Sequence, residues 1–259
     1  MMEIGVEQLC ENIYVMNEAN KDSAVDAYLI LGSERAALVD TLQDATGLYE
    51  KVREFTSLPL DVLITHGHGD HVGRSIMEFA DAGCRIYMDL KDVAELQFFN
   101  PDVKVDSFID LKEGMIFDLG GYKLETIYCG GHTLGSVVFL DRERQLLFSG
   151  DSIGSGNFWM QLPGSMVMTD FYKNLTCLQR KLEGMDKLVI HPGHRWQMPG
   201  QLTAEYIEDV AAIAEGIIDG KLVGTEEELH FGNIHMPYRI IEQGMVCSFC
   251  YDPNKIGSV

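Results

Sequence analysis

The chain has 259 residues, 46% of them hydrophobic and 23% charged, which allows a sizeable core in one large or two small domains. Its net charge of −20 argues against nucleic acid as partner or substrate, because phosphate binding depends on clustered Lys and Arg. No run of about 18 apolar residues and no basic, apolar leader is visible, so we expect no membrane partner and a cytoplasmic location.

The first half of the chain alternates short apolar runs with segments of helical periodicity. Strands are predicted at 12–16, 27–31, 36–39, 60–65 and 85–88, and helices at 48–55, 72–82 and 93–99. Gly32-Ser33 is typical of a hairpin turn between two of these strands, and Gly83 of a helix C-terminus.

The second half repeats this order. Strands are predicted at 115–118, 122–128, 136–141, 145–149 and 187–190, with a helix at 171–182. Two similar halves indicate two packed sheets with helices outside, a four-layer αββα sandwich. We expect one domain over 1–259, in which 201–259 adds a helix at 204–217 and a hairpin-like segment that caps the site. The sequence leaves a homo-oligomer open.

Six cysteines are scattered along the chain, which does not predict a disulfide framework in a protein of this length. The one close pair, Cys247 and Cys250, lies in an apolar, strand-like stretch. A zinc site would need two more ligands. We therefore interpret the pair as buried structural thiols that point to opposite faces of a strand.

Four metal-ligand side chains lie within six residues: His66, His68, Asp70 and His71. Neutral imidazole and carboxylate are the usual ligands of zinc and similar divalent ions. In an extended loop His66 and His68 point to the same side and can reach one ion. Asp70 and His71 follow a turn and suit a second ion. The cluster also follows a predicted strand, where catalytic groups gather.

Three more candidate ligands each follow a predicted strand. His132 lies in Cys-Gly-Gly-His, Asp151 in Ser-Gly-Asp and His194 in His-Pro-Gly-His. Singly, each is more often a structural, hydrogen-bonded residue. Their repeated position at strand ends makes them candidates for completing the site.

The motif Thr65-His-Gly-His-Gly-Asp-His71, followed by Gly131-His132, Gly150-Asp151 and Gly193-His194, closely resembles the metallo-β-lactamase fold superfamily over roughly residues 10–200. The resemblance implies an αββα fold with a dinuclear site between two sheets. It implies His66, His68 and His132 on one metal, Asp70, His71 and His194 on the other, and Asp151 bridging both. Asp40 resembles the family's buried aspartate, which supports the site without ligating. His194 rather than His191 matches the ligand that follows a glycine.

Two divalent ions, most simply Zn²⁺ although Fe or Mn would also suit His and Asp ligands, would lower the pKa of a shared water to about 7. We expect this hydroxide to attack the carbonyl of a small ester, lactone or thioester, with catalytic roles for Asp151 as bridging ligand and Asp70 as a group that orients the nucleophile. Phe158 and Trp159, just beyond Asp151, and Tyr172, a candidate proton donor, are the candidate substrate-pocket residues.

Two alternatives remain open at this point. A mononuclear iron sulfur dioxygenase would take its metal histidines from the same positions. A phosphodiesterase would share the dinuclear centre, although the charge of −20 argues against a nucleic-acid substrate.

Overall fold

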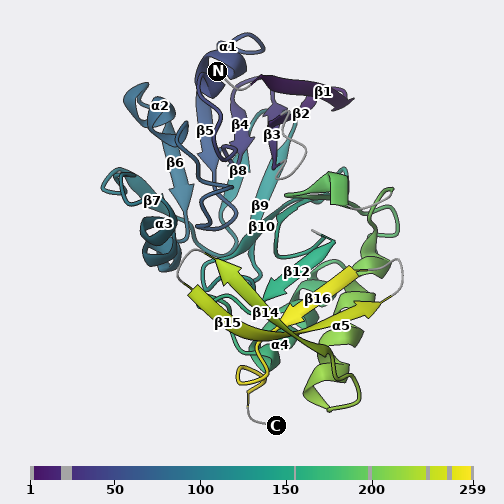
Figure 1. The fold of residues 1–259 in the computed structure, drawn as a ribbon. Helices are drawn as coiled ribbons and strands as arrows, with labels where there is room; N and C mark the ends of the chain where they lie inside the picture. The colour runs from purple at the N-terminus through teal and green to yellow at the C-terminus, as the bar shows by residue number, and fades with distance from the viewer. Residues whose placement is uncertain are drawn as a thin grey trace.

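Two β-sheets packed face to face form the centre of the molecule (Figure 1). The computed structural model describes residues 3–18, 25–154, 156–197, 200–231, 234–243 and 247–257. The first sheet has the order β1 (Ile4–Cys10), β2 (Ile13–Glu18), β3 (Asp26–Leu31), β4 (Ala36–Val39), β5 (Leu60–Leu63), β6 (Arg85–Met88) and β7 (Phe108–Asp110). The second has the order β13 (Val189–Pro192), β11 (Leu146–Gly150), β10 (Val137–Asp141), β9 (Lys123–Tyr128) and β8 (Ile116–Asp118).

Strands of the first sheet are apolar on both faces, and the two faces enter different clusters. In β3, Tyr28 and Ile30 join the cluster shared by the two sheets, whereas Ala27 and Leu29 join the cluster on the outer face. Such doubly buried strands read as continuous apolar runs. The run at 27–31 is therefore a strand covered on both sides, as a four-layer sandwich requires.

Helices cover the outer faces. Between strands of the first sheet the chain forms α1 (Leu48–Arg53), α2 (Ile76–Asp81), the 3₁₀ turn η1 (Leu90–Asp92) and α3 (Val93–Phe99). In the second half it forms α4 (Met168–Lys181) before β13, and then η2 (Arg195–Gln197) and α5 (Ala204–Ile218) after it. The expected helices at 93–99 and 204–217 are confirmed to within one residue. Within the described part of the chain, no helix has the length and apolarity needed to cross a bilayer.

The helix expected at 72–82 is shorter, since α2 begins only at Ile76. The preceding turn is bound elsewhere: the Val72 amide donates to the His68 carbonyl at 2.9 Å, and the Ser75 hydroxyl donates to the Thr41 carbonyl at 2.7 Å. The helix-like spacing of apolar residues at 72–75 therefore reflects their burial against the neighbouring loop and not a helix. The prediction of helix there was wrong because tertiary hydrogen bonds replace the helical ones.

A third sheet is built mainly from the C-terminal segment; it contains the hairpin that was expected there, whereas its pairing with a strand near residue 158 was not expected. Its order is β12 (Asn157–Met160), β16 (Cys247–Tyr251), β15 (Ile234–Gln243) and β14 (Thr225–Phe231). β12 and β16 are parallel, and Phe158 stacks on Phe249 with ring centroids 5.3 Å apart. Cys247 and Cys250 are buried in β16, and none of the six cysteines is in a disulfide.

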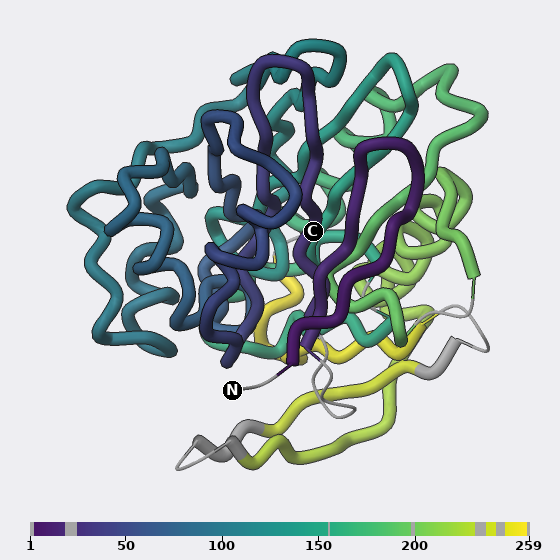
Figure 2. The backbone as a smooth tube through the Cα atoms, turned by 90° about the horizontal axis from the view of Figure 1, so that it is seen from above, coloured from purple at the N-terminus to yellow at the C-terminus, as the bar shows by residue number. Residues whose placement is uncertain are grey.

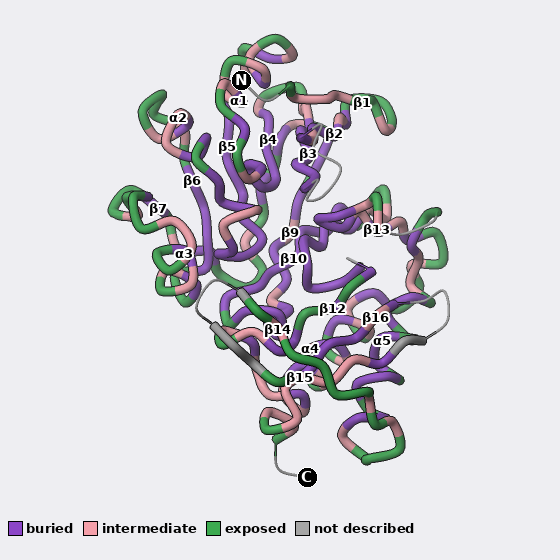
Figure 3. Tube along the Cα trace, in the orientation of Figure 1, coloured by how far each residue is buried: buried purple, intermediate pink, exposed green. Residues whose placement is uncertain are grey.

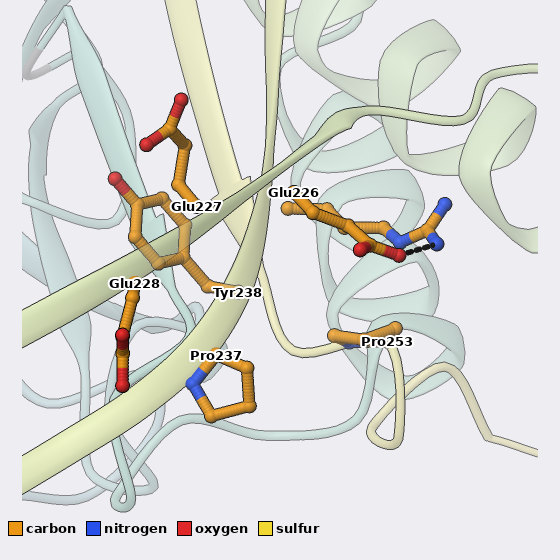
Figure 4. Close-up of a pocket in the computed structure, with 7 residues that line it drawn as sticks. Glu226, Glu227, Glu228, Pro237, Tyr238 and Pro253 are labelled. Carbon is orange, nitrogen blue, oxygen red and sulfur yellow. Dashed lines mark hydrogen bonds and ion pairs between the residues drawn. The ribbon is translucent and has the colours of Figure 1, made fainter.

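The hairpin β14–β15 extends from the rest of the molecule as an arm (Figure 2), and β14 is exposed from Thr225 to Glu228 (Figure 3). Its surface holds a shallow hollow lined by acidic side chains of β14 and by Pro237, Tyr238, Arg239 and Pro253 (Figure 4). None of the candidate metal ligands lines this hollow. It is therefore separate from the site described next.

Candidate metal centre

The candidate ligands lie where strands of the first two sheets end. His66–His71 form the loop after β5, and Asp151 follows β11 directly. The Val137 amide of the second sheet donates to the Thr65 carbonyl of the first at 2.9 Å. This contact fixes the two sheet edges against each other, so that residues more than 60 positions apart meet at one place.

The structure brings all seven candidate ligands together. Their ligand atoms form three overlapping groups in which every atom lies within 4.8 Å of the others. The groups are His66, His68 and His132; His66, His71 and Asp151; and Asp70, His71 and His194. The first and third groups correspond to the two sets that the resemblance implies, and the middle group joins them through Asp151.

Each of four histidines is held by a hydrogen bond at one ring nitrogen. His66 Nδ1 pairs with Thr65 Oγ1 at 3.0 Å, His71 Nδ1 with Asp40 Oδ2 at 2.8 Å, His132 Nδ1 with the Trp159 carbonyl at 2.9 Å, and His68 Nε2 with Glu95 Oε1 at 3.3 Å. Such partners fix the ring orientation and leave the opposite nitrogen as the ligand. The rings are thus set for Nε2 ligation, except His68, which presents Nδ1.

The Asp40 carboxylate contacts both ends of the candidate ligand loop. Its carboxylate accepts hydrogen bonds from the Thr65 amide and hydroxyl, both at 2.8 Å, and from His71 Nδ1. Asp40 has a φ of 61°, in the left-handed region, where non-glycine residues are strained. One buried carboxylate therefore orients both the start of the ligand loop and one of its histidines.

Several ligand atoms have no hydrogen-bond partner among the described residues although they are buried: His66 Nε2, His71 Nε2, His132 Nε2 and Asp151 Oδ1. A buried polar atom without a partner costs about 1–3 kcal/mol. Imidazole nitrogen and carboxylate oxygen are the donors that zinc, iron and manganese accept. These residues therefore fit divalent metal ions, which would bind the atoms that lack a hydrogen bond.

The electrostatics divide the site in two. In the three-histidine group, burial and the neighbouring histidines lower the pKa of His132 to about 4 and hold the pKa of His66 well below its usual value. Both rings are therefore neutral at pH 7, the form that binds metal. In the group that contains His194, burial disfavours the protonated ring, but the carboxylates of Asp151 and Asp70 outweigh it and raise the pKa of His194 to about 10.

Two of the three candidate pocket residues lie elsewhere. Phe158 is buried in the cluster around α4 and α5, where it packs on Phe249 and Phe171. The hydroxyl of Tyr172 donates to Glu215 on α5 at 3.0 Å. The expectation was wrong for both, because alternation in β12 turns Phe158 inward and helix packing turns Tyr172 toward α5. Trp159, which faces the other way, is 38% exposed.

His191 does not join the ligand groups. Its ring lies in β13, 5.2 Å from the ring of Phe148 and 5.5 Å from that of Tyr28. It is a strand residue in aromatic surroundings, consistent with the choice of His194 over His191 as the candidate ligand.

Sequence reasoning missed three carboxylates that contact the ligand loops. Glu95 pairs with His68, Asp92 accepts from the Gly67 amide, and Asp26 accepts from the Arg195 amide. In the sequence Asp92 is an ordinary aspartate before a helix, and Glu95 lies on a helical face without a motif. The only available signal was the position of Asp92 one residue before the helix predicted at 93–99.

Curated proteins of similar sequence include a hydrolase and two thioesterases. The chain is 28% identical over 181 residues to hydroxyacylglutathione hydrolase GloC of Haemophilus influenzae, covering 62% of this chain and 80% of that protein. It is 27% identical over 209 residues to the human acyl-coenzyme A thioesterase MBLAC2, covering 71% and 72%. Over 134 residues it is 26% identical to an atrochrysone carboxyl ACP thioesterase of Aspergillus fumigatus, covering 51% and 37%.

Solved structures agree on the fold. A metallo-beta-lactamase from Pontibacter korlensis superposes with a TM-score of 0.66 at 17% identity, covering 82% of this chain and 99% of that one. A metallo-beta-lactamase family protein from Thermus thermophilus gives a TM-score of 0.63 at 20% identity, covering 82% of each. The family model of the metallo-beta-lactamase superfamily matches residues 20–194. The chain belongs to the metallo-beta-lactamase superfamily.

Proposed function

We propose that this protein is a thioester hydrolase that uses two divalent metal ions, held by His66, His68 and His132 on one side, Asp70, His71 and His194 on the other, and Asp151 between them. The observation that carries the proposal is the set of overlapping ligand groups with buried, unpaired ligand atoms. Three relatives are named for hydrolysis of thioesters that differ in the thiol carrier. The shared chemistry is attack on an acyl–sulfur carbonyl.

Two metal ions, when bound, supply a hydroxide nucleophile at neutral pH and polarise the carbonyl under attack. Asp70 is the most exposed of the candidate carboxylates, with 33% of its side chain accessible against 10% for Asp151. This accessibility supports the role proposed for Asp70, which would accept a hydrogen bond from the attacking water and orient it toward the substrate.

The leaving group supports a thioester over an ester. An alkoxide needs a proton donor to leave at neutral pH, whereas a thiol with a pKa of about 8.5 leaves readily as thiolate. Tyr172, the donor first considered, is bonded to Glu215 instead. A thiolate leaving group needs no proton donor in place of Tyr172.

Aromatic side chains near the ligands favour an apolar acyl group. The Phe99 ring lies 5.2 Å from that of His68, and Trp159 lies in β12, where its own carbonyl bonds to His132. Trp196 is 54% exposed two residues after His194. Binding of a linear acyl chain on such a surface contributes up to about 0.8 kcal/mol per methylene. We expect kcat/KM to rise with chain length, by at most about fourfold per methylene.

The test is hydrolysis of acyl thioesters from two to ten carbons, beside matched oxygen esters, lactones and phosphodiesters. Thioesters should be hydrolysed fastest, and removal of a ligand in His132→Ala or Asp151→Ala should lower kcat/KM by more than about 100-fold. Tyr172→Phe is the matched control and should retain full activity. Preference for phosphodiesters, or full activity in Asp151→Ala, would contradict the proposal.

A further inference from the structure

Two buried carboxylates outside the candidate ligand set each hold the backbone of a ligand loop. Asp92 is 1% exposed and Asp26 is 3% exposed. They belong to different elements, since Asp92 precedes α3 whereas Asp26 begins β3. Burial of a carboxylate is costly unless donors compensate it, so the donors show what each group does.

Asp92 connects two ligand loops. Its Oδ2 accepts from the Gly67 amide at 2.9 Å and from the Thr133 hydroxyl at 2.5 Å, and its Oδ1 accepts from the Gly135 amide at 2.6 Å. Gly67 lies between His66 and His68, and Thr133 follows His132. One carboxylate thus joins the backbones that carry all three histidines of the first group.

The packing around Asp92 is specific for these contacts. A Cβ at Gly67 would lie 2.6 Å from the Asp92 carbonyl oxygen, and a Cβ at Gly135 would lie 2.7 Å from Asp92 Cγ. Neither glycine can be replaced without moving Asp92 or its loop. Asp92 also stands at the N-cap of α3, yet its side chain makes no capping hydrogen bond. An aspartate there normally accepts from its own helix, so this one serves the ligand loops instead.

Asp26 holds the backbone on both sides of His194. Its amide donates to the Gly193 carbonyl at 2.7 Å, and its Oδ2 accepts from the Arg195 amide at 2.8 Å. The Arg195 Nε lies 3.6 Å from the same oxygen. The peptide that carries His194 is therefore bracketed by one residue of the first sheet.

We infer that Asp92 and Asp26 are positioning residues for separate halves of the metal centre, Asp92 for the three-histidine half and Asp26 for the half that contains His194. Their hydrogen-bonded partners do not overlap. The inference rests on the metal centre of the proposed function, but it concerns metal affinity at each half and not the substrate.

The experiment is a Zn²⁺ competition titration of metal-free protein against a chromophoric chelator. We expect two Zn²⁺ per wild-type chain. Asp92→Asn keeps the size of the side chain but turns an amide group toward one of its donors. It should weaken one Zn²⁺ by about 10–100-fold and leave the other unchanged. Asp26→Asn should weaken the other Zn²⁺.

Variants that each lack one half assign the effects. In a His132→Ala background, the Zn²⁺ that remains should be insensitive to Asp92→Asn and sensitive to Asp26→Asn. In a His194→Ala background the pattern should be reversed. If Asp92→Asn does not fold, Thr133→Val removes one donor to the same carboxylate and should weaken the same Zn²⁺ several-fold.

Asp61→Asn is the control for loss of a buried charge. Asp61 is 1% exposed and pairs with Arg35 and Arg85 at the opposite end of β5 from the ligand loop. It should lower stability and leave both Zn²⁺ affinities unchanged. Equal weakening of both Zn²⁺ by Asp92→Asn, or the same loss in Asp61→Asn, would overturn the inference. Two Zn²⁺ with no thioester hydrolysis would overturn the proposed function alone.

Discussion

At the scale of single residues, burial decides which titratable groups carry charge. Cys129 shows this outside the metal centre, since burial raises the pKa of its thiol to about 12. The thiolate is the reactive form of cysteine. Cys129 is therefore an inert core residue, as expected of cysteines scattered through a chain without disulfides.

His191 makes stability depend on pH. Burial and nearby Arg195 lower the pKa of His191 to about 4. The contribution of His191 to stability is thus fully present above its pKa in the unfolded chain, about 6.5, and is lost as pH falls toward 4. In this pH range the unfolded chain binds a proton at His191 that the folded chain does not bind, so the free energy of unfolding decreases as the pH falls. At pH 5 the loss is about 1 kcal/mol, allowing for solvent around a partly buried ring.

His191→Phe should keep the stacking on Phe148 and remove this loss. Urea unfolding at pH 7.5 and pH 5 measures it: the variant should gain stability relative to wild type as pH falls. Because the ligand histidines titrate equally in both proteins, the difference isolates His191. If the free energy of unfolding changed by the same amount between the two pH values in both proteins, His191 would not be the source of the pH dependence.

At the scale of elements, the C-terminal segment is bonded to the loop that precedes α4. The Nζ of Lys255 donates to the carbonyls of Leu162, Pro163 and Ser165, at 2.9, 2.8 and 3.2 Å. The Ser165 hydroxyl in turn donates to the His132 carbonyl at 3.0 Å. The expected cap at 201–259 is therefore proposed here as a brace, which fastens the loop between β12 and α4 against a ligand residue.

Lys255→Met keeps most of the side-chain length and removes all three hydrogen bonds. A hydrogen bond to a charged group contributes about 2 kcal/mol, so amide exchange in the loop at 161–166 should become roughly 30-fold faster. Hydrogen-exchange mass spectrometry measures this. Lys173→Met, at an exposed lysine on α4, is the control and should leave the exchange of the loop unchanged. Unaltered exchange in Lys255→Met would contradict the brace.

At the scale of the whole molecule, the candidate metal centre lies where the two sheets meet, so we expect metal binding to be coupled to folding. A ligand present at 1,000 times its dissociation constant adds about 4 kcal/mol. For a domain of this size that raises Tm by roughly 8–16 °C. Thermal unfolding with EDTA and after addition of Zn²⁺ tests this, with Mg²⁺ as the control because it disfavours imidazole. No difference between EDTA and Zn²⁺ would argue against a metal centre.

Strand and helix placement was largely predictable from sequence where burial has a simple period. The strands at 27–31 and 60–65 and the helix at 93–99 were predicted for this reason, since a covered strand is apolar throughout and α3 has one apolar face. The start of α2 and the strand β12 were not, because hydrogen bonds to distant loops and pairing with β16 decide them.

The sequence by itself determined the ligand candidates, since His66 to His71 are adjacent in the chain and their spacing is a local property. It also determined the αββα class through the repeated order of apolar runs. Only the tertiary structure decided that Phe158 and Tyr172 turn away from the site, and that Asp92 and Asp26 hold the ligand loops. The physical reason is that a carboxylate's donors come from loops far apart in sequence, and no local pattern records which loops will meet.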